Sequence, residues 1–167
     1  MDRVMVFIDG SNLLFSLIDN QFQSRNFNYS LFVNELVGSN RRLIRAYYYD
    51  APIKQSGNKS KYQSQQKFFD RLKRLDYLEV RLGRIQNGHQ KGVDVKIAVD
   101  MINFAVNNLY DTAILVSGDS DLVPAVESVK ALGKHVELAF FDKCHHLRNI
   151  CDVFNELNST ILNKCYN

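Results

Sequence analysis

Few residues in this chain of 167 break regular structure, since it has only two prolines and eight glycines. That is too few for a disordered linker or a collagen-like repeat. No apolar run approaches the roughly 18 residues that a membrane-spanning helix needs, so we expect no membrane protein. The N-terminal stretch carries Asp2 and Asp9 and has no long apolar region, so we expect no secretory signal.

The three cysteines are an odd number, and all lie near the C-terminus: Cys144, Cys151 and Cys165. Free thiols in a cytoplasmic protein are the simplest interpretation, ahead of a disulfide. His145 and His146 lie between the first two cysteines, but this spacing fits no common structural zinc site.

Several motifs of common enzyme classes are missing. The glycines form neither a GxGxxG fingerprint nor a GxxxxGK[ST] loop, so a dinucleotide-binding protein or a P-loop NTPase is poorly supported. No GxSxG motif is present, and Ser11 and Ser117 have no obvious histidine partner. Asp9 is followed by Gly-Ser and not by a second Asp two residues on, which counts against an aspartyl-phosphate phosphatase.

The chain has an ordinary globular composition, with 46% hydrophobic and 23% charged residues, and its length suits one domain over residues 1–167. Short apolar runs alternate with helical periodicities, which predicts a three-layer α/β/α sandwich with a mostly parallel, Rossmann-like sheet of about five strands. The expected strands are residues 4–8, 43–49, 78–82, 112–116 and 136–140. The expected helices are residues 13–18, 30–37 with Ser30 as N-cap, 61–75, 93–108, 122–132 and 145–157, with a polar loop at 83–92.

Charge is unevenly distributed along the chain. The net charge is +3, but residues 54–91 hold ten Lys and Arg against three Asp and Glu, a local +7. The rest of the chain therefore carries −4. This basic stretch is either a solvated helix face or a surface that holds phosphates beside a separate acidic site.

Acidic residues follow two of the expected strands. Asp9 comes directly after the first strand with Asn12 three residues on, and Asp119 and Asp121 follow the strand at 112–116. If these parallel strands are neighbours, their carboxyl ends bring the side chains to one edge of the sheet. Such acids repel unless a cation lies between them, and oxygen ligands suit Mg²⁺ or Mn²⁺. Asp121 could instead simply cap the next helix.

The helix expected at 93–108 carries two further acids. At 100° per residue, Asp94 shares a face with apolar residues such as Met101 and Ala105, so it should face the sheet. A carboxylate there needs a partner or a metal. Asp100 falls on the opposite, polar face, where the same geometry predicts a solvated acid.

Three blocks of sequence, each in its expected structural context, resemble the NYN domain family, specifically its LabA-like branch, within the PIN-like nuclease superfamily. They are FIDGSNL (residues 7–13), KGVDVKIAVDM (91–101) and ILVSGDSDLVPAV (114–126), with a weaker match in HLRNICDVFNEL (146–157). Their order and spacing agree with the family, so the resemblance covers nearly the whole chain.

The resemblance implies a PIN-like sheet with an acidic pocket that binds Mg²⁺ or Mn²⁺ and cleaves RNA endonucleolytically. Matched positions make Asp9, Asp94, Asp119 and Asp121 the metal-site acids. Asn12 and Ser117 would orient ligands or the scissile phosphate, Lys91 would contact phosphate, and Asp100 also matches a family acid.

A basic surface would then hold the RNA, which is single-stranded in this interpretation. Its candidate residues are Lys59, Lys61, Arg71, Arg74 and Arg84. Tyr62 or Phe68 would stack on bases if exposed, although their helical spacing favours burial.

Two other functions stay open. The same pocket would also suit a non-catalytic regulatory protein that binds RNA or a nucleotide, or a phosphatase or nucleotide hydrolase acting on a smaller substrate. A homodimer is also open: Tyr47–Tyr49 and Phe140-Phe141 are either core or interface, and small nucleases of this superfamily often pair.

Overall fold

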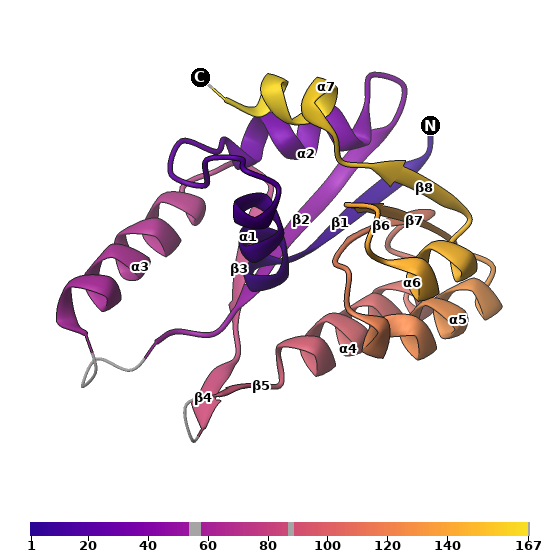
Figure 1. Ribbon diagram of the computed structural model, residues 1–167. Helices are drawn as coiled ribbons and strands as arrows, with labels where there is room; N and C mark the ends of the chain where they lie inside the picture. Colours follow the sequence, from indigo (N-terminus) through magenta and orange to yellow (C-terminus); the bar gives the residue numbers. More distant parts are fainter. Residues whose placement is uncertain (54–57, 87–88, 167) are drawn as a thin grey trace.

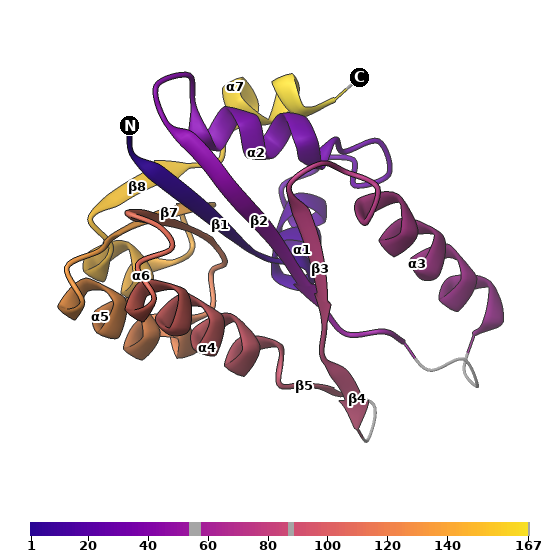
Figure 2. The ribbon, with the colours of Figure 1, turned by 180° about the vertical axis from the view of Figure 1, so that it is seen from behind.

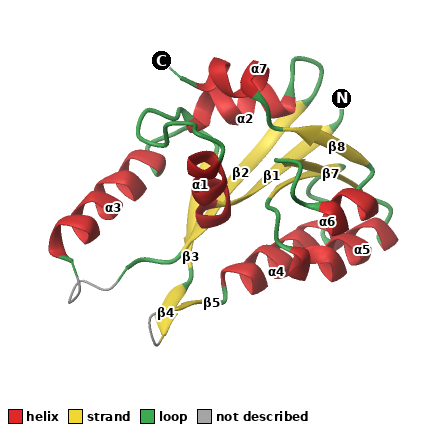
Figure 3. Cartoon of the chain, viewed as in Figure 1, coloured by secondary structure: helices red, strands yellow, loops and turns green. Residues whose placement is uncertain are grey.

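The structure is a computed structural model and describes residues 1–53, 58–86 and 89–166. Its centre is a parallel six-stranded sheet in the order β3-β2-β1-β6-β7-β8 (Figures 1 and 3). The strands are β1 (Arg3–Asp9), β2 (Arg42–Asp50), β3 (Leu78–Leu82), β6 (Thr112–Val116), β7 (His135–Phe140) and β8 (Val153–Glu156), and a separate hairpin joins β4 (Arg84–Gln86) to β5 (His89–Lys91). The helices are α1 (Gly10–Asp19), α2 (Tyr29–Val37), α3 (Lys59–Leu72), α4 (Val93–Val106), α5 (Val123–Ala131), α6 (His145–Ile150) and α7 (Ser159–Leu162), with short 3₁₀ turns η1 (Ser120–Leu122) and η2 (Asn163–Cys165).

Helices cover both faces of the sheet, which confirms the predicted three-layer α/β/α sandwich. Alternate residues of β2 point to opposite faces. Tyr47 stacks on Phe104 of α4, with ring centroids 5.1 Å apart, whereas Tyr48 packs edge-on against Tyr29 of α2 and Phe68 of α3. Figures 1 and 2 show α1, α2 and α3 on one side of the central strands and α4 on the other.

The strand order reverses beside β1. The chain runs from β1 outward through β2 to β3, then crosses back to β6 on the other side of β1 and continues to β7 and β8. Adjacent β1 and β6 are thus the point where two crossover directions diverge, and ligands of parallel α/β sheets bind beyond the carboxyl ends of such strands.

Two predicted elements differ in the structure. The helix predicted at 145–157 ends at Ile150, and Val153–Glu156 forms a sixth strand that pairs with β7. Asp152 fixes this change of direction, because its carboxylate accepts a hydrogen bond of 2.8 Å from the backbone N–H of Val136. The predicted loop at 83–92 contains the β4–β5 hairpin, whose register pairs Arg84 with Lys91; residues 87 and 88 lie outside the described residues.

The expected cap of the second helix was also wrong. Asn28, not Ser30, caps α2, and its side-chain oxygen accepts hydrogen bonds of 3.1 Å from the backbone N–H groups of Ser30 and Leu31. The aromatic residues that were either core or interface are all buried: Tyr47, Tyr48, Tyr49, Phe140 and Phe141. These aromatic residues therefore belong to the core.

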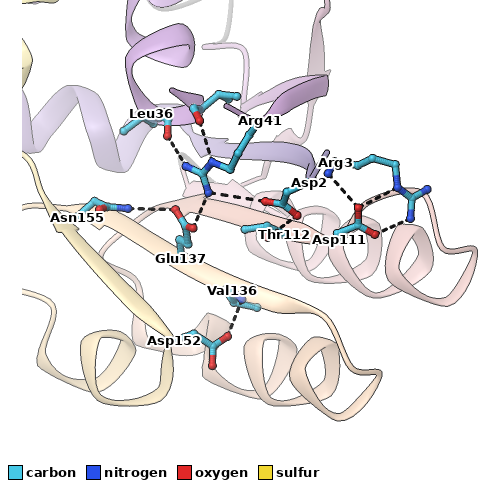
Figure 4. A network of polar contacts seen from close by, with 11 residues as sticks. Asp2, Arg3, Leu36, Arg41, Asp111, Thr112, Val136, Glu137, Asp152 and Asn155 are labelled. Carbon is cyan, nitrogen blue, oxygen red and sulfur yellow. Dashed lines mark hydrogen bonds and ion pairs between the residues drawn. The ribbon is translucent and has the colours of Figure 1, made fainter. Parts of the chain in front are cut away.

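Polar contacts tie the sheet together near the amino ends of its strands (Figure 4). The Arg41 guanidinium lies 2.6 Å from Glu137 of β7 and donates a hydrogen bond to the Leu36 carbonyl at the end of α2. Arg3 of β1 forms a bidentate pair with Asp111, which precedes β6. These contacts therefore stabilise the sheet at the amino ends of its strands, opposite the candidate site.

Among the described residues, no helix is both long and apolar enough to cross a membrane.

Candidate functional site

The carboxyl ends of β1 and β6 are joined by side-chain hydrogen bonds. Asp9 ends β1, and its carboxylate accepts one bond of 3.1 Å from the Asn12 backbone N–H and another of 3.1 Å from the Ser117 hydroxyl. In return, the Asn12 side-chain oxygen accepts a 2.9 Å bond from the Gly118 backbone N–H. Asp9 therefore caps α1 and at the same time fixes the loop that follows β6.

Close packing beneath α1 explains why glycine follows Asp9. A Cβ at residue 10 would lie 2.2 Å from Cζ of Tyr48, a side chain that is 1% exposed in the core. Any larger side chain would push α1 away from the sheet and would move the Asp9 cap with it.

Asp119 and Asp121 take different positions. The Asp119 backbone N–H donates a 3.1 Å hydrogen bond to the Ser117 hydroxyl, and the Asp119 carboxylate caps η1 by accepting a bond of 3.0 Å from the Asp121 N–H. The residue that caps the next turn is thus Asp119, not Asp121. The Asp121 side chain is exposed.

Asp94 reaches the same region from α4. This helix starts at Gly92, which adopts a left-handed conformation (φ 77°) that favours glycine and offers no side-chain cap. Asp94 is the acid of the first turn, where it is stabilised by the positive end of the helix dipole. Its half-buried side chain points into a pocket, in keeping with the inward position expected from the sequence.

These residues surround a pocket with a volume of about 330 Å³, which we call the acidic pocket. It is lined by Asp9, Ser11, Asn12, Phe15, Val93, Asp94 and Asp119. Three of these seven residues are acids and none is basic. Asp121 and Ser117 are outside the lining, although Ser117 holds Asp9 in place.

Burial makes Asp9 the most perturbed acid of the pocket. The side chain is only 7% exposed, and this desolvation raises its pKa to about 6, while the charges of Asp119 and Asp50 add to the increase. The hydrogen bonds from Asn12 and Ser117 act in the opposite direction. A cation in the pocket would therefore be favourable at neutral pH, because it would offset the cost of an ionised, buried carboxylate.

The donor set fits Mg²⁺ or Mn²⁺. Every candidate ligand in the acidic pocket is an oxygen of a carboxylate, an amide or a hydroxyl, as hard cations prefer. Among the described residues, no group of three or more His, Cys, Asp or Glu side chains lies close enough together to hold a metal ion directly. Mg²⁺ keeps several waters and is often bound through one or two carboxylates, so a hydrated ion remains compatible with this pocket.

Asp100 lies apart from the acidic pocket, and its predicted solvation was wrong. The side chain is only 13% exposed, lies 2.6 Å from the Arg81 guanidinium and accepts a 2.8 Å hydrogen bond from the Tyr49 hydroxyl. The buried stripe of α4 runs through Val93, Ile97, Met101 and Ala105. It shares Met101 and Ala105 with the predicted face but begins at Val93 and not at Asp94. Asp100, seven residues after Val93, lies on the same side as Val93 and contacts β2 and β3.

The predicted basic residues lie on or near α3 and on the β4–β5 hairpin, and none of them lines the acidic pocket. The exposed set comprises Lys59, Lys61 and Arg71 on α3, Arg74 just after it, and Arg84 and Lys91 on the hairpin. Arg71 also lines a second, larger pocket. Phe68 is half-buried, packs against Tyr29 and Tyr48, and lines the same second pocket.

Sequence reasoning missed two residues. Asp50 ends β2 beside Asp9, is 5% exposed, and accepts a 2.8 Å hydrogen bond from the Ser11 hydroxyl. Its position directly after the strand run at 43–49 was the available signal. Phe15 is 65% exposed and lines the acidic pocket. An aromatic residue six positions after the strand-end acid, on the helix that this acid caps, gave only a weak indication.

The protein thus has a parallel α/β fold, with acidic residues at the point where the strand order reverses. The NYN domain model matches residues 3–158, so the chain belongs to the NYN domain family and with it to the PIN-like nuclease superfamily. It is similar to the low amplitude and bright protein LabA of Synechococcus elongatus, with 30% identity across 93% of this chain and 84% of that protein.

Two solved structures share the fold. A protein of unknown function from Vibrio parahaemolyticus has a TM-score of 0.72 and 24% identity, and covers 94% of this chain and 93% of its own. UDP-GlcNAc 2-epimerase from Methanocaldococcus jannaschii has a TM-score of 0.51 and 10% identity, and the match spans 98% of this chain but 41% of the epimerase. At these identities the likeness concerns the fold alone.

Proposed function

We propose that this protein is a metal-dependent ribonuclease that cleaves RNA at the acidic pocket with Mg²⁺ or Mn²⁺. The observation that carries the proposal is the convergence of Asp9, Asp94 and Asp119 on one pocket at the ends of β1 and β6, in a chain of the NYN family. The buried Asp9, with its raised pKa, is the group that gains most from a bound cation.

In this proposal, a hydrated ion would lie in the acidic pocket, bound directly by one or two of the carboxylates of Asp9, Asp94 and Asp119 and through water by the rest. When bound, it would lower the pKa of a water molecule and neutralise charge that grows on the phosphate. Ser117 keeps the Asp9 carboxylate oriented through its hydrogen bond. Asn12 holds the Gly118 backbone, and with it the loop that carries Asp119. Asp121, which is exposed and outside the pocket lining, has no ligand role here.

The chain also supplies groups that would bind the RNA strand. Phe15 presents an exposed ring at the acidic pocket, and an unpaired base can stack on such a ring. The exposed cations Lys59, Lys61 and Arg71 give α3 a basic surface that attracts phosphates. A single strand suits this arrangement better than a duplex, because its bases are free to stack.

Cleavage of a fluorescent single-stranded RNA by EDTA-treated protein tests the proposal. Wild-type protein should cleave after Mg²⁺ or Mn²⁺ is added, and Asp9→Asn and Asp119→Asn should lose this activity while still folding. The matched control is Asp19→Asn, which changes an exposed acid at the far end of α1 and should cleave normally.

Three results would contradict the proposal. Cleavage that survives both Asp9→Asn and Asp119→Asn would remove the assigned site. RNA binding that weakens with salt, with no product under any metal condition, would favour a non-catalytic regulatory binding protein. Release of phosphate from mononucleotides without RNA cleavage would favour a phosphatase or nucleotide hydrolase.

A further inference from the structure

A second pocket, which we call the large pocket, lies on the face of the sheet covered by α1, α2 and α3. Its volume is about 760 Å³, more than twice that of the acidic pocket and within the range of small-molecule sites. Leu14 of α1 lines the large pocket, whereas the next residue, Phe15, lines the acidic pocket. One helix therefore contributes to both.

The large pocket combines an acidic floor, aromatic walls and a basic rim. Asp50, a buried carboxylate at the end of β2, is the only acid among the lining residues. Phe68 and Tyr29 supply rings whose centroids lie 5.7 Å apart, and their contact holds both rings in place. Arg25 and Arg71 also line the pocket, and both side chains are exposed.

A hydrogen bond connects the two pockets. Ser11 lines the acidic pocket, and its hydroxyl donates a 2.8 Å bond to Asp50 in the large pocket. Asp9 and Asp50 end neighbouring parallel strands, and the charge of Asp50 contributes to the raised pKa of Asp9. A ligand that extends from one pocket to the other would therefore cross only the first turn of α1.

We propose that the large pocket binds one unpaired nucleotide of the RNA, adjacent to the nucleotide whose phosphate enters the acidic pocket; this rests on the proposed ribonuclease function. The base lies against Phe68 with its N–H donors toward the acidic floor, and the phosphate lies at the rim with Arg25 and Arg71. A nucleotide matches this polarity, since its base carries donors and its phosphate is anionic. The pocket thus selects which nucleotide stands beside the cleaved bond.

Binding of the four nucleoside 5′-monophosphates to the full chain in EDTA tests this directly by calorimetry. At least one should bind, and ribose 5-phosphate, which lacks a base, should bind at least about fivefold more weakly, since base stacking on an aromatic ring contributes about 1–3 kcal/mol. Equal binding of ribose 5-phosphate, or no binding by any of the four, would overturn the inference.

Two variants locate the binding in the large pocket. Leu75→Trp fills it from one wall, and Arg71→Ala removes a cation from its rim; each should weaken nucleotide binding about tenfold or more. The matched control is Lys73→Ala, because Lys73 pairs with Asp70 and is outside the lining. Thermal unfolding establishes that each variant is folded, and unchanged affinity in both folded pocket variants would overturn the assignment.

The two proposals can fail separately. Asp119→Asn should bind mononucleotides as wild type does, because Asp119 lines only the acidic pocket. Nucleotide binding without RNA cleavage would leave the large pocket as a nucleotide site and remove the ribonuclease function. Cleavage whose preferred positions are the same in wild type, Leu75→Trp and Arg71→Ala would keep the ribonuclease and remove the selective role of the large pocket.

Discussion

The Ser117 hydroxyl donates a 3.1 Å hydrogen bond to the Asp9 carboxylate and accepts one of 3.1 Å from the Asp119 N–H. Ser117 is fully buried, so this single oxygen links two acids of the candidate site within the protein interior. The acids come from segments more than a hundred residues apart in the sequence, and a small hydroxyl sets their relative position.

Ser117→Ala should therefore destabilise the fold and disturb the site together. It removes one donor from Asp9 and leaves the Asp119 N–H without its acceptor, a loss we expect to cost about 1–3 kcal/mol in the free energy of unfolding. Without that donor, the pKa of Asp9 should rise further. Urea unfolding measures the loss, with Ser128→Ala as control, since Ser128 is exposed and bonds only within α5. A Ser117→Ala protein as stable as the control would contradict this role.

A variant of the Arg81–Asp100 pair should change the stability of the fold without changing the candidate site. Asp100 accepts a hydrogen bond from Tyr49 and pairs with Arg81, whose guanidinium lies 4.6 Å from the Tyr47 ring centroid. Asp100→Asn should lower the free energy of unfolding by about 1–3 kcal/mol, since it weakens charge-assisted bonds at a half-buried position.

The same variant separates a structural acid from a catalytic one. Metal-dependent cleavage per folded Asp100→Asn molecule should equal that of wild type, because Asp100 lies outside the acidic pocket. The measurement is cleavage rate at a temperature where both proteins are folded. Loss of cleavage with unchanged stability would return Asp100 to the catalytic group.

The positions of Asp9 and Asp119 were predictable because strand ends are readable. Continuous apolar runs define buried parallel strands, and a residue that follows such a run must lie at the carboxyl edge. The register of β1 with β6, which pairs Ile8 with Val116, brings these ends side by side. Whether the two strands are neighbours stayed a condition of that prediction, and the strand order of the sheet fulfils it.

The same reasoning does not predict three features of the structure: the position of Asp100, the position of Asp50 and the strand β8. The predicted face of α4 included Asp94 with Met101 and Ala105, whereas the buried stripe of the structure includes Val93 and Ile97 with the same Met101 and Ala105. Asp100 lies seven residues after Val93, about two helical turns on, and so falls on the buried side. Asp50 follows the strand predicted at 43–49, but the sequence pattern does not place the end of that strand beside the end of β1, as the structure does. The four residues of β8 are too few for periodicity to distinguish a strand from a helix.

Because of the Arg3–Asp111 pair (Figure 4), the free energy of unfolding should depend on pH in the acid range. Hydrogen bonds from Arg3 lower the pKa of Asp111 to about 2. A lowered pKa means that folding favours the ionised form, so the stabilisation is complete above about pH 4 and is lost as the pH falls toward 2. Because the Asp111 side chain is 38% exposed, solvent screening limits the pair to about 0.5–1 kcal/mol.

Asp111→Asn should accordingly be less stable than wild type at pH 7, with a difference that narrows below pH 4. Chemical unfolding at several pH values measures it. Asp142→Asn is the control, since Asp142 pairs with Arg148 at a more exposed position and should change stability little. A difference that stays constant from pH 7 to pH 3 would show that the charge of Asp111 is not responsible.

Phe15 offers a test of RNA contact that is independent of metal. Its ring is 65% exposed beside three acids, a costly position for an apolar group unless a ligand covers it. Stacking of a base on an aromatic side chain contributes about 1–3 kcal/mol, so Phe15→Ala should weaken binding of a single-stranded RNA about 5- to 150-fold in EDTA.

Fluorescence anisotropy with a labelled oligonucleotide measures this change, and unfolding experiments should show stability within about 0.5 kcal/mol of wild type. Ile18→Ala is the matched control, because Ile18 is 53% exposed on the same helix but outside the acidic pocket. Phe15→Trp should retain binding, since a larger ring also stacks. If Phe15→Ala and Ile18→Ala bind RNA equally well, the strand does not pass over this end of α1.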